Sequence, residues 1–456
     1  MRIVLVGAGV VGFHLAEHLS RGGHDISVVD NRPELIRQIN DKMDVLAILG
    51  DASIPSVLER AGAVGADLVI AVTDRDTTNL LVSLIARRMG AKKCIVRVRN
   101  SEFSGTNRFV KPEDVGADLV INTVNITADR LERLVRNPGA TDVAEFADGD
   151  LFLWGFNVSP ASPLVGVKLK ELRQRYGTLE ALIVAIYRSD GSLVIPTGDD
   201  ELLVGDNIYV FIRTKATKAF RQLVHPEEER VDKVVISGAT PIGVEVARRL
   251  EGRVRKLILV DADREAAEAA SEQVSRVDIV CGDVSDPTFA REYGLENADF
   301  FLALTNDDQT NLVHGLLAKN KEGAKRSGVL AQQPHYLDVL RLLGADIVVN
   351  PRLQTVNEIL THIRRGRILH VTRIGETGAE AREYLATQGC PIVGKPLKSA
   401  GMPRGAIVSA IIRGDTFEIP RGESIVQAGD HVVILALPEA ESKVDRLFSR
   451  SKLFHR

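Results

Sequence analysis

The chain contains 456 residues, of which 45% are hydrophobic and 26% are charged. This length predicts about three or four domains with well-filled apolar cores. The formal net charge of −3 provides no basic surface for DNA or RNA, so a nucleic-acid partner is not expected. No apolar run approaches the roughly 20 residues of a membrane-spanning helix, and no signal leader precedes the first strand, so we expect a cytoplasmic protein.

Short apolar runs alternate with helical segments over the first part of the chain. The predicted strands are residues 3–6, 26–29, 45–48, 68–72, 95–98 and 119–121. Continuous apolar runs of this length are typical of parallel strands that are buried on both faces. Residues 13–20 and 77–88 have helical spacing, and an amphipathic helix is predicted over 122–136. The alternation predicts an α/β fold with a Rossmann-like, doubly wound parallel sheet.

A glycine-rich turn follows the first predicted strand and opens the first helix. Such a turn lets a pyrophosphate approach the backbone at Gly9 and the amide groups of the helix N-terminus. Asp30 ends the second strand, where a carboxylate can accept both ribose hydroxyls, which favours NAD(H) or an adenosine nucleotide over NADP(H). The candidate cofactor-binding residues of this first site are Gly7, Ala8, Gly9, Val10, Val11, Gly12, Asp30, Asn31, Gly50, Asp51, Thr73, Asp74 and Arg97.

A small α+β module is predicted after this unit, over residues 140–213. It begins with a helical segment at 168–176. Strands at 181–187 and 193–195 flank Asp190-Gly191, a strong hairpin-turn signal, and a last strand covers 208–212.

The second half of the chain repeats both parts in the same order. Gly12 to Asp30 and Gly243 to Asp261 each span 18 positions. Spacing held this closely indicates a duplicated architecture. The predicted domains are a Rossmann-like domain at 1–137, a small α+β module at 138–224, a second Rossmann-like domain at 231–365 and a second small module at 366–450. The polar segment 225–230 is predicted to link the halves.

The glycine motif of the second copy is incomplete. Thr240 stands in place of the middle glycine, so a side chain occupies the position where a pyrophosphate needs bare backbone. Gln332 stands near the position of Arg97. Two interpretations stay open, a structural mimic without a dinucleotide or a site for a different nucleotide. The candidate residues are Gly238, Ala239, Thr240, Pro241, Ile242, Gly243, Asp261, Asp283, Thr305 and Asn306.

The sequence offers no convincing catalytic set. A dehydrogenase needs a substrate domain with an acid or base near the nicotinamide, whereas the small modules carry no convergent His, Lys or Tyr residues. The three cysteines are isolated, and we assign no catalytic or metal-binding residue. A nucleotide site without chemistry favours a sensor, in which the ligand biases the arrangement of packed domains. The alternatives are an NAD-dependent oxidoreductase and a repeat scaffold with vestigial nucleotide pockets.

The order of the four parts and their motifs resembles the TrkA family of regulatory subunits of bacterial Trk potassium uptake systems, which carry tandem RCK (KTN) domains. The resemblance rests on Gly7 to Gly12 with Asp30, Gly50-Asp51, the run 95–98 and the paired small modules. It implies a cytosolic homo-oligomer, a dimer of dimers that forms a ring, on an integral-membrane potassium-translocating subunit of the TrkH/TrkG type. It also implies control by NAD(H) or ATP/ADP, with the helix at 122–136 as a dimerising element.

Overall fold

The computed structural model describes residues 1–21, 23–103, 111–176, 180–188, 190–226, 230–363, 368–374, 379–414 and 416–449. These residues form two compact units. The first unit contains Met1–Glu132 and Val231–Leu360, and the second contains Arg133–Arg230 and Thr361–Arg456. Each unit therefore combines a segment from each half of the chain. Residues 227–229 of the predicted linker lie outside the described residues.

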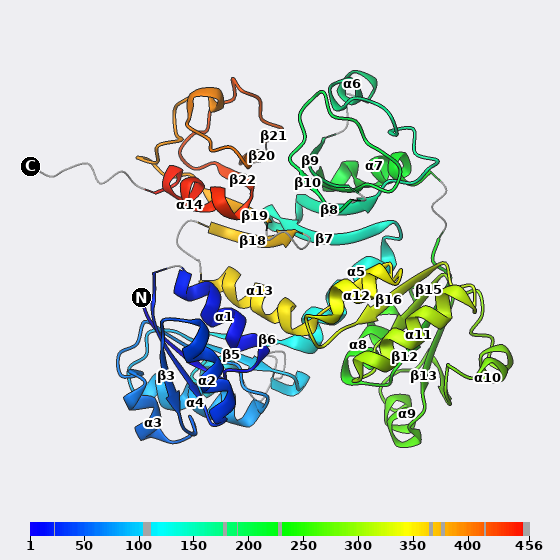
Figure 1. Ribbon diagram of the computed structural model, residues 1–456, viewed down its shortest axis with the longest axis horizontal. Helices are drawn as coiled ribbons and strands as arrows, with labels where there is room; N and C mark the ends of the chain where they lie inside the picture. The colour runs from blue at the N-terminus through cyan, green and yellow to red at the C-terminus, as the bar shows by residue number, and fades with distance from the viewer. Residues whose placement is uncertain are drawn as a thin grey trace, which may run out of the picture. The chain divides into compact units, whose positions relative to one another are not determined.

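The first half of the first unit is a parallel sheet packed with helices, drawn in blue and cyan in Figure 1. Its six strands lie in the order β3-β2-β1-β4-β5-β6. Its strands are β1 (Arg2–Val6), β2 (Asp25–Asp30), β3 (Leu46–Leu49), β4 (Leu68–Ala71), β5 (Cys94–Val98) and β6 (Leu119–Asn122). The helices are α1 (Val10–Arg21), α2 (Pro33–Lys42), α3 (Pro55–Arg60), α4 (Asp76–Arg88) and α5 (Thr123–Arg136). All six predicted strands are confirmed, and so is the doubly wound fold class.

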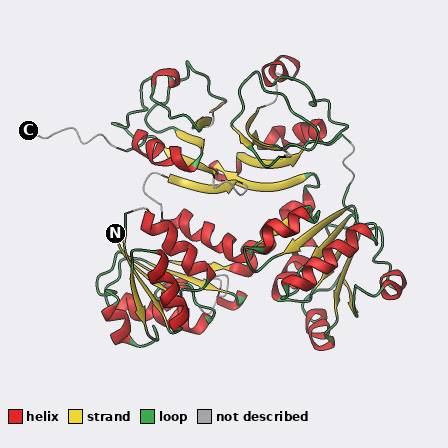
Figure 2. Ribbon diagram, viewed as in Figure 1, coloured by secondary structure: helices red, strands yellow, loops and turns green. Residues whose placement is uncertain are grey.

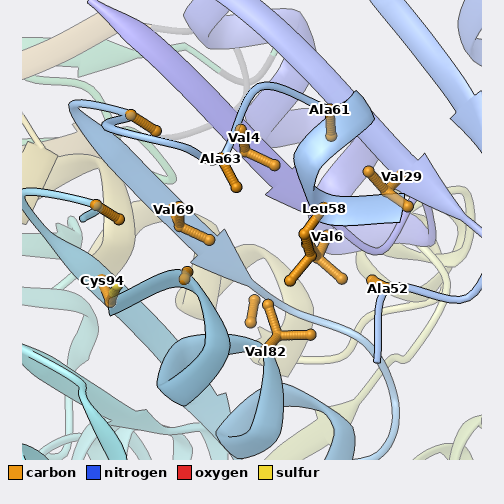
Figure 3. Packing of buried hydrophobic residues seen from close by; sticks show 14 of the residues in the cluster. Val4, Val6, Val29, Ala52, Leu58, Ala61, Ala63, Val69, Val82 and Cys94 are labelled. Carbon is orange, nitrogen blue, oxygen red and sulfur yellow. The ribbon is translucent and has the colours of Figure 1, made fainter. Parts of the chain in front are cut away.

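The core of this half explains why its strands are continuous apolar runs. Val4 and Val69 on neighbouring strands pack with Leu58 of α3, Val82 of α4 and Cys94 of β5, and each is at most 1% exposed (Figure 3). A strand that is covered by helices on both faces has no position for a polar side chain in its middle. The polar side chains therefore lie at the ends of the strands, where the candidate site is found.

The second half of the first unit repeats this topology in the order β14-β13-β12-β15-β16-β17. The strands are β12 (Lys233–Ser237), β13 (Lys256–Asp261), β14 (Asp278–Cys281), β15 (Phe300–Ala303), β16 (Arg326–Leu330) and β17 (Ile347–Val349). The helices are α8 (Pro241–Leu250), α9 (Arg264–Ser271), α10 (Pro287–Glu292), α11 (Asp308–Asn320), α12 (Tyr336–Leu342) and α13 (Pro351–Ile363). The predicted duplication is confirmed strand by strand.

Helices α5 and α13 join the two sheets of the first unit. The hydroxyl oxygens of Thr123 and Thr355 lie 3.0 Å apart, and Arg130 Nη1 donates to Gln354 Oε1 at 3.3 Å. Arg253 of the second half forms an ion pair with Glu132 of α5 at 2.9 Å. The amphipathic helix predicted at 122–136 therefore finds a packing partner within its own chain.

The second unit contains two small, mostly antiparallel sheets, seen as yellow strands in Figure 2. The first sheet, β10-β9-β11-β8-β7, consists of β7 (Ala140–Phe146), β8 (Leu151–Asn157), β9 (Ala181–Tyr187), β10 (Leu193–Val194) and β11 (Asn207–Arg213), with α6 (Leu169–Arg175) and α7 (Thr217–Val224). The second, β18-β19-β22-β20-β21, consists of β18 (Ile368–Ile374), β19 (Ala379–Leu385), β20 (Ala406–Arg413), β21 (Thr416–Glu418) and β22 (His431–Ala436), with α14 (Pro438–Leu447).

One apolar cluster joins these two small sheets. Phe146 and Phe211 of the first sheet and Ala381, Val433 and Leu435 of the second are buried together in it. The predicted hairpin around Asp190-Gly191 is confirmed as β9 and β10. The strands β7, β8, β18 and β19 were not predicted. Short 3₁₀ helices cover Ser101–Phe103, Pro112–Val115, Ala147–Gly149, Thr214–Ala216 and Leu397–Ser399.

Candidate nucleotide crevices

The glycine turn of the first half has no room for side chains at two of its three glycines. Gly7 has a φ of +103°, which L side chains rarely adopt. A Cβ on Gly12 would lie 1.7 Å from the carbonyl oxygen of Gly7, so Gly12 is needed for the close packing of α1 against the turn. A Cβ on Gly9 would meet only Arg32 Nη2, at 3.7 Å, an ordinary contact. Gly9 is therefore not required by the fold itself, and only the Arg32 side chain lies near the place where a Cβ would stand.

Asp30 fastens this turn to the end of β2. The carboxylate is 7% exposed, and its Oδ2 accepts a hydrogen bond from the backbone amide of Ala8 at 2.7 Å. Its Oδ1 accepts from the backbone N and the Nε of Arg32, at 2.9 and 3.2 Å. The hydrogen bond to Asp30 raises the pKa of Arg32 above its ordinary value. The sequence indicated only that Arg32 weakens the exclusion of a 2′-phosphate by Asp30, and it was not predicted as a site residue. In the structure its guanidinium contacts Asp30 and lies near the Cβ position of Gly9.

Thr73 and Asn79 form a fixed edge of the crevice. Asn79, which is fully buried, accepts from the backbone N of Thr73 at 2.9 Å and from its hydroxyl at 2.6 Å. Asn79 Nδ2 donates to the backbone oxygens of Thr73 and Arg97 at 3.0 and 2.9 Å. The ends of β4 and β5 are thereby held together before any ligand arrives.

A cavity of about 370 Å³ opens at the carboxyl ends of these strands. It is lined by Val6, Val29, Asp30, Asn31, Arg32, Gly50, Asp51, Ala52, Thr73, Asp74, Arg75 and Thr78. Six of the sequence-predicted site residues thus lie together around one cavity. Gly7 to Gly12 and Arg97 are not among the lining residues. Hydrogen bonds from the Ser53 side chain and backbone lower the pKa of Asp51, which keeps that carboxylate charged.

The second half repeats the backbone hydrogen bonds of the first crevice, but some of its side chains differ. Asp261 Oδ2 accepts from the backbone N of Ala239 at 2.6 Å, as Asp30 does from Ala8. Thr305 and Asn311 repeat the pairing of Thr73 and Asn79, with Asn311 Oδ1 at 2.8 Å from the backbone N of Thr305. Gly238 has a φ of +111°, equivalent to that of Gly7.

Thr240 closes the glycine turn of the second half. Its hydroxyl donates to the carbonyl oxygen of Leu304 at 2.8 Å and accepts from the backbone N of Gly243 at 3.2 Å. One amide at the N-terminus of α8 is therefore already satisfied by the protein. A pyrophosphate cannot use this turn as it can use the turn at Gly9.

A buried polar pair replaces apolar residues in the second half. Ser237 Oγ lies 2.8 Å from His314 Nδ1, at positions that correspond to Val6 and Val82 of the first half. Burial lowers the pKa of His314, although Asp283, 3.8 Å from Nε2, and Asp261 act in the opposite direction. His314 is therefore held mainly neutral.

A second cavity, of about 610 Å³, adjoins the second half and carries three arginines. Its lining is Arg97, Arg99, Thr123, Val124, Thr240, Pro241, Ile242, Leu304, Thr305, Asn306, Asp307, Asp308, Gln309, Leu330, Gln332, Gln333, Tyr336, Pro351 and Arg352. The list includes five of the residues predicted for the second site, but neither Asp261 nor Asp283. Arg97, predicted for the first site, lies here instead, together with Arg99 and Arg352, which the sequence did not single out.

Arg97 is 7% exposed, and its Nε donates to Thr123 Oγ1 at 3.0 Å. Burial, followed by repulsion from Arg99 and Arg352, lowers the pKa of Arg97 to about 10. Within the described part of the chain, no carboxylate forms an ion pair with any of these three guanidinium groups. The lining also contains the carboxylates Asp307 and Asp308, so the three guanidinium groups leave it with an excess of positive charge, which favours an anionic ligand.

Comparison with known proteins gives the family. A TrkA-N domain matches residues 3–123 and 234–351, and a TrkA-C domain matches residues 155–225 and 381–449. The Trk system potassium uptake protein TrkA of Halomonas elongata is 32% identical over 453 residues, 98% of each chain. That of Vibrio alginolyticus is 31% identical over the full length of both chains, and a TrkA homolog of Archaeoglobus fulgidus is 33% identical over 98% of this chain and 100% of its own.

Solved structures share the fold. The GsuK RCK domain superposes with a TM-score of 0.63 at 20% identity, covering 98% of this chain and 94% of its own. A GsuK channel bound to NAD gives a TM-score of 0.62 at 21% identity, with coverages of 98% and 78%. None of the helices in the described part of the chain has the length and apolarity that crossing a membrane requires. The full-length matches and the duplicated TrkA-N and TrkA-C domains show that the chain belongs to the TrkA family, the non-enzymatic regulatory proteins of Trk potassium uptake systems.

Proposed function

We propose that this chain couples nucleotide binding in the first crevice to the conduction of potassium by an integral-membrane subunit of the TrkH/TrkG type. The observation that carries the proposal is the hydrogen bond from the backbone N of Ala8 to Asp30, which ties the glycine turn to a residue that lines the first cavity. Gly9 of that turn carries no side chain, and a Cβ there would meet only Arg32. The transport system is proposed from the relatives, which are named as Trk system potassium uptake proteins.

NAD(H) is the proposed ligand of the first crevice, with ATP or ADP as the alternative. The two carboxylate oxygens of Asp30 suit the ribose hydroxyls, and the amides after Gly9 suit a pyrophosphate. A GsuK channel has been solved with NAD and another GsuK structure with ADP, which supports both ligands. Arg32 must turn away from Asp30 for the ribose to bind, and it then lies where a phosphate can meet it.

For the second crevice, we propose a phosphate-rich anion rather than a dinucleotide held by a glycine turn. Thr240 fills the turn, whereas Arg97, Arg99 and Arg352 bring positive charge to the adjoining cavity. Arg97 and Arg99 belong to the first half of the unit and Arg352 belongs to the second. An anion bound here would therefore contact both halves. Such a ligand would favour one arrangement of α5 against α13, which is all that regulation requires.

The assembly and location follow from the same family. We propose a homo-oligomeric ring, a dimer of dimers, held at the cytoplasmic face of the membrane by the transporter subunit. The four-domain division at 1–137, 138–224, 231–365 and 366–450 is part of this proposal. In this division, the Rossmann-like domains bind ligand and the small modules bind neighbouring copies of the chain.

Potassium flux into vesicles that contain the membrane subunit tests the function. Flux is measured with the full chain added, with and without NADH, ADP or ATP. At least one nucleotide should change the flux by several-fold, and Gly9→Ala should abolish the response to the ligand of the first crevice. Gly9→Ala suits this test because its Cβ meets nothing closer than 3.7 Å. A flux that no nucleotide changes would contradict the proposal, and so would oxidation of NADH when carbonyl compounds are added.

A further inference from the structure

The second unit has a cavity of its own, of about 660 Å³, between the first and second small modules. Its apolar walls come from both modules. They are Leu164, Leu169, Leu172, Leu182, Ile183, Phe220 and Leu223 from the first, and Ile407, Phe417 and Ile419 from the second. The volume lies within the range of about 300 to 1,000 Å³ that small-molecule sites occupy, and such sites are mostly apolar with a few placed polar groups.

The walls of the cavity continue the shared core of the unit. Leu182, Ile407 and Phe417 pack against the apolar cluster that joins the two small sheets. The guanidinium carbon of Arg213, on β11, lies 5.7 Å from the centre of the Phe417 ring. The cavity is therefore bounded by side chains that are held in place from both modules, and an occupant would touch both at once.

Two of the four charged side chains in the lining, Lys170 and Glu180, form ion pairs. Lys170 Nζ lies 2.5 Å from Asp199 Oδ1. Glu180 Oε2 lies 3.0 Å from Lys215 Nζ and 3.5 Å from Arg213 Nη1.

Two polar side chains of the lining have unused donors. Among the described residues, the guanidinium of Arg421 has no ion-pair partner and the hydroxyl of Tyr176 has no hydrogen-bond partner. Glu418, the remaining acid of the lining, accepts a hydrogen bond from Ser424. The lining therefore offers an occupant one exposed, unpaired guanidinium from the second module and one free hydroxyl donor from the first.

We propose that this cavity binds an organic acid with an extended apolar body, whose carboxylate is held by Arg421 and Tyr176. The apolar body replaces water against the leucine, isoleucine and phenylalanine walls. The carboxylate forms charge-assisted hydrogen bonds with the planar guanidinium, which matches its geometry. Because the walls belong to two modules, the acid adjusts how the modules are held together, independently of the nucleotide crevices.

The test uses the full chain and the fluorescent probe anilinonaphthalene sulfonate, an apolar anion of the same chemical class. Trp154 is the only tryptophan of the sequence and lies on β8 of the first small module. Energy transfer from Trp154 therefore reports probe that is bound near this module. Decanoate should displace the probe in a saturable way, and decanol, which lacks the charge, should do so more weakly.

Two variants distinguish the contribution of the Arg421 charge to binding from that of the apolar walls. Arg421→Gln should weaken decanoate binding about tenfold and leave decanol unchanged, since a hydrogen bond to a charged group is worth about that much. Ile407→Phe, which narrows the cavity, should weaken both compounds. Arg404→Gln and Leu203→Phe, at exposed positions outside the lining, are the matched controls.

The same titration in saturating ADP decides where the probe is bound. Displacement by decanoate that persists with ADP supports the proposal. It is overturned if ADP alone removes the signal, if no energy transfer from Trp154 occurs, or if neither Arg421→Gln nor Ile407→Phe changes the displacement curve.

Discussion

Asn79 holds Thr73 through both its backbone amide and its hydroxyl, at 2.9 and 2.6 Å, and Asn311 holds Thr305 in the same way at 2.8 and 2.7 Å. In each half the asparagine also bonds the carbonyl oxygen at or near the end of the next strand, that of Arg97 or Leu330. The edge of each crevice is thus built by one buried side chain. Both halves keep this clamp, the pair of hydrogen bonds between the asparagine and the threonine, although the glycine turn of the second half has changed.

We expect Asn79→Ala and Asn311→Ala each to lower the free energy of unfolding by about 2 to 3 kcal/mol, because each leaves several buried polar groups without partners. Urea denaturation followed by circular dichroism measures this. Asn306→Ala, at an exposed position between β15 and α11, should change stability by less than about 0.5 kcal/mol. Equal, small effects at all three positions would show that the clamp is not a stabilising feature.

Asp30 has a binding role and a structural role that two variants can separate. Asp30→Ala removes the acceptor of the buried Ala8 amide, so it should lower stability by about 1 to 3 kcal/mol and abolish NADH binding. Asp30→Asn keeps an acceptor oxygen but loses the charge. It should retain most of the stability and bind NADH at least about tenfold more weakly.

Calorimetric titration with NADH provides the affinities for these variants. Asp261→Asn, the same change in the second half, is the control and should leave the first crevice unaffected. NADH affinity that is unchanged in Asp30→Asn would exclude Asp30 as a ribose ligand.

Arg352→Gln should not lower the melting temperature of the free protein, but it should reduce the rise in melting temperature that an anion produces. In the free protein it relieves repulsion with Arg97 and Arg99, so the melting temperature should stay equal or rise slightly. With pyrophosphate added, the wild-type chain should gain stability as the ligand saturates it, and the variant should gain less. A variant that is destabilised alone and responds normally to pyrophosphate would rule out the anion site.

The pair Ser237 and His314 should make the second half sensitive to acid. The pKa of His314 in the folded chain lies below its ordinary value of about 6.5, so the unfolded chain binds the proton more readily. Stability from this group is complete above about pH 6.5, falls as the pH is lowered toward the folded pKa, and levels off below it.

The double variant Ser237→Val with His314→Val, which reproduces Val6 and Val82 of the first half, should lose this component. Melting temperatures at about pH 7 and about pH 5 measure the difference. A variant that is as acid-sensitive as the wild type would assign the loss of stability to other groups.

The sequence predicted the parts of the fold whose strands are uniformly apolar. All six strands of the first sheet and the spacing of the second follow from burial on both faces. Strand β19 was missed because it carries Glu380, Arg382 and Glu383, each at most 4% exposed. Arg382 is paired inside the module with Glu380, at 2.7 Å, and with Asp445 of α14, at 3.0 Å. A buried ion network of this kind gives a strand the composition of a surface segment.

The candidate site was predictable only as far as local motifs reach. Asp30, Asn31, Gly50, Asp51, Thr73 and Asp74 follow strand ends of one sheet, and one cavity gathers them. The place of Arg97 depends on how α5 packs on α13, a long-range contact between the halves that no local pattern encodes. The same contact brings Arg352 to Arg97.

The proposed nucleotide site depends on the backbone around Gly9, which would hold the phosphates of the ligand. Calorimetric titration of NADH, and of ADP, into the full chain and into Gly9→Ala tests it most directly, because that Cβ fits the free structure and obstructs only a ligand. We expect saturable binding of at least one of them to the wild type. Gly9→Ala should bind that ligand at least about tenfold more weakly and keep the melting temperature of the wild type. Equal affinity in the two proteins would contradict it.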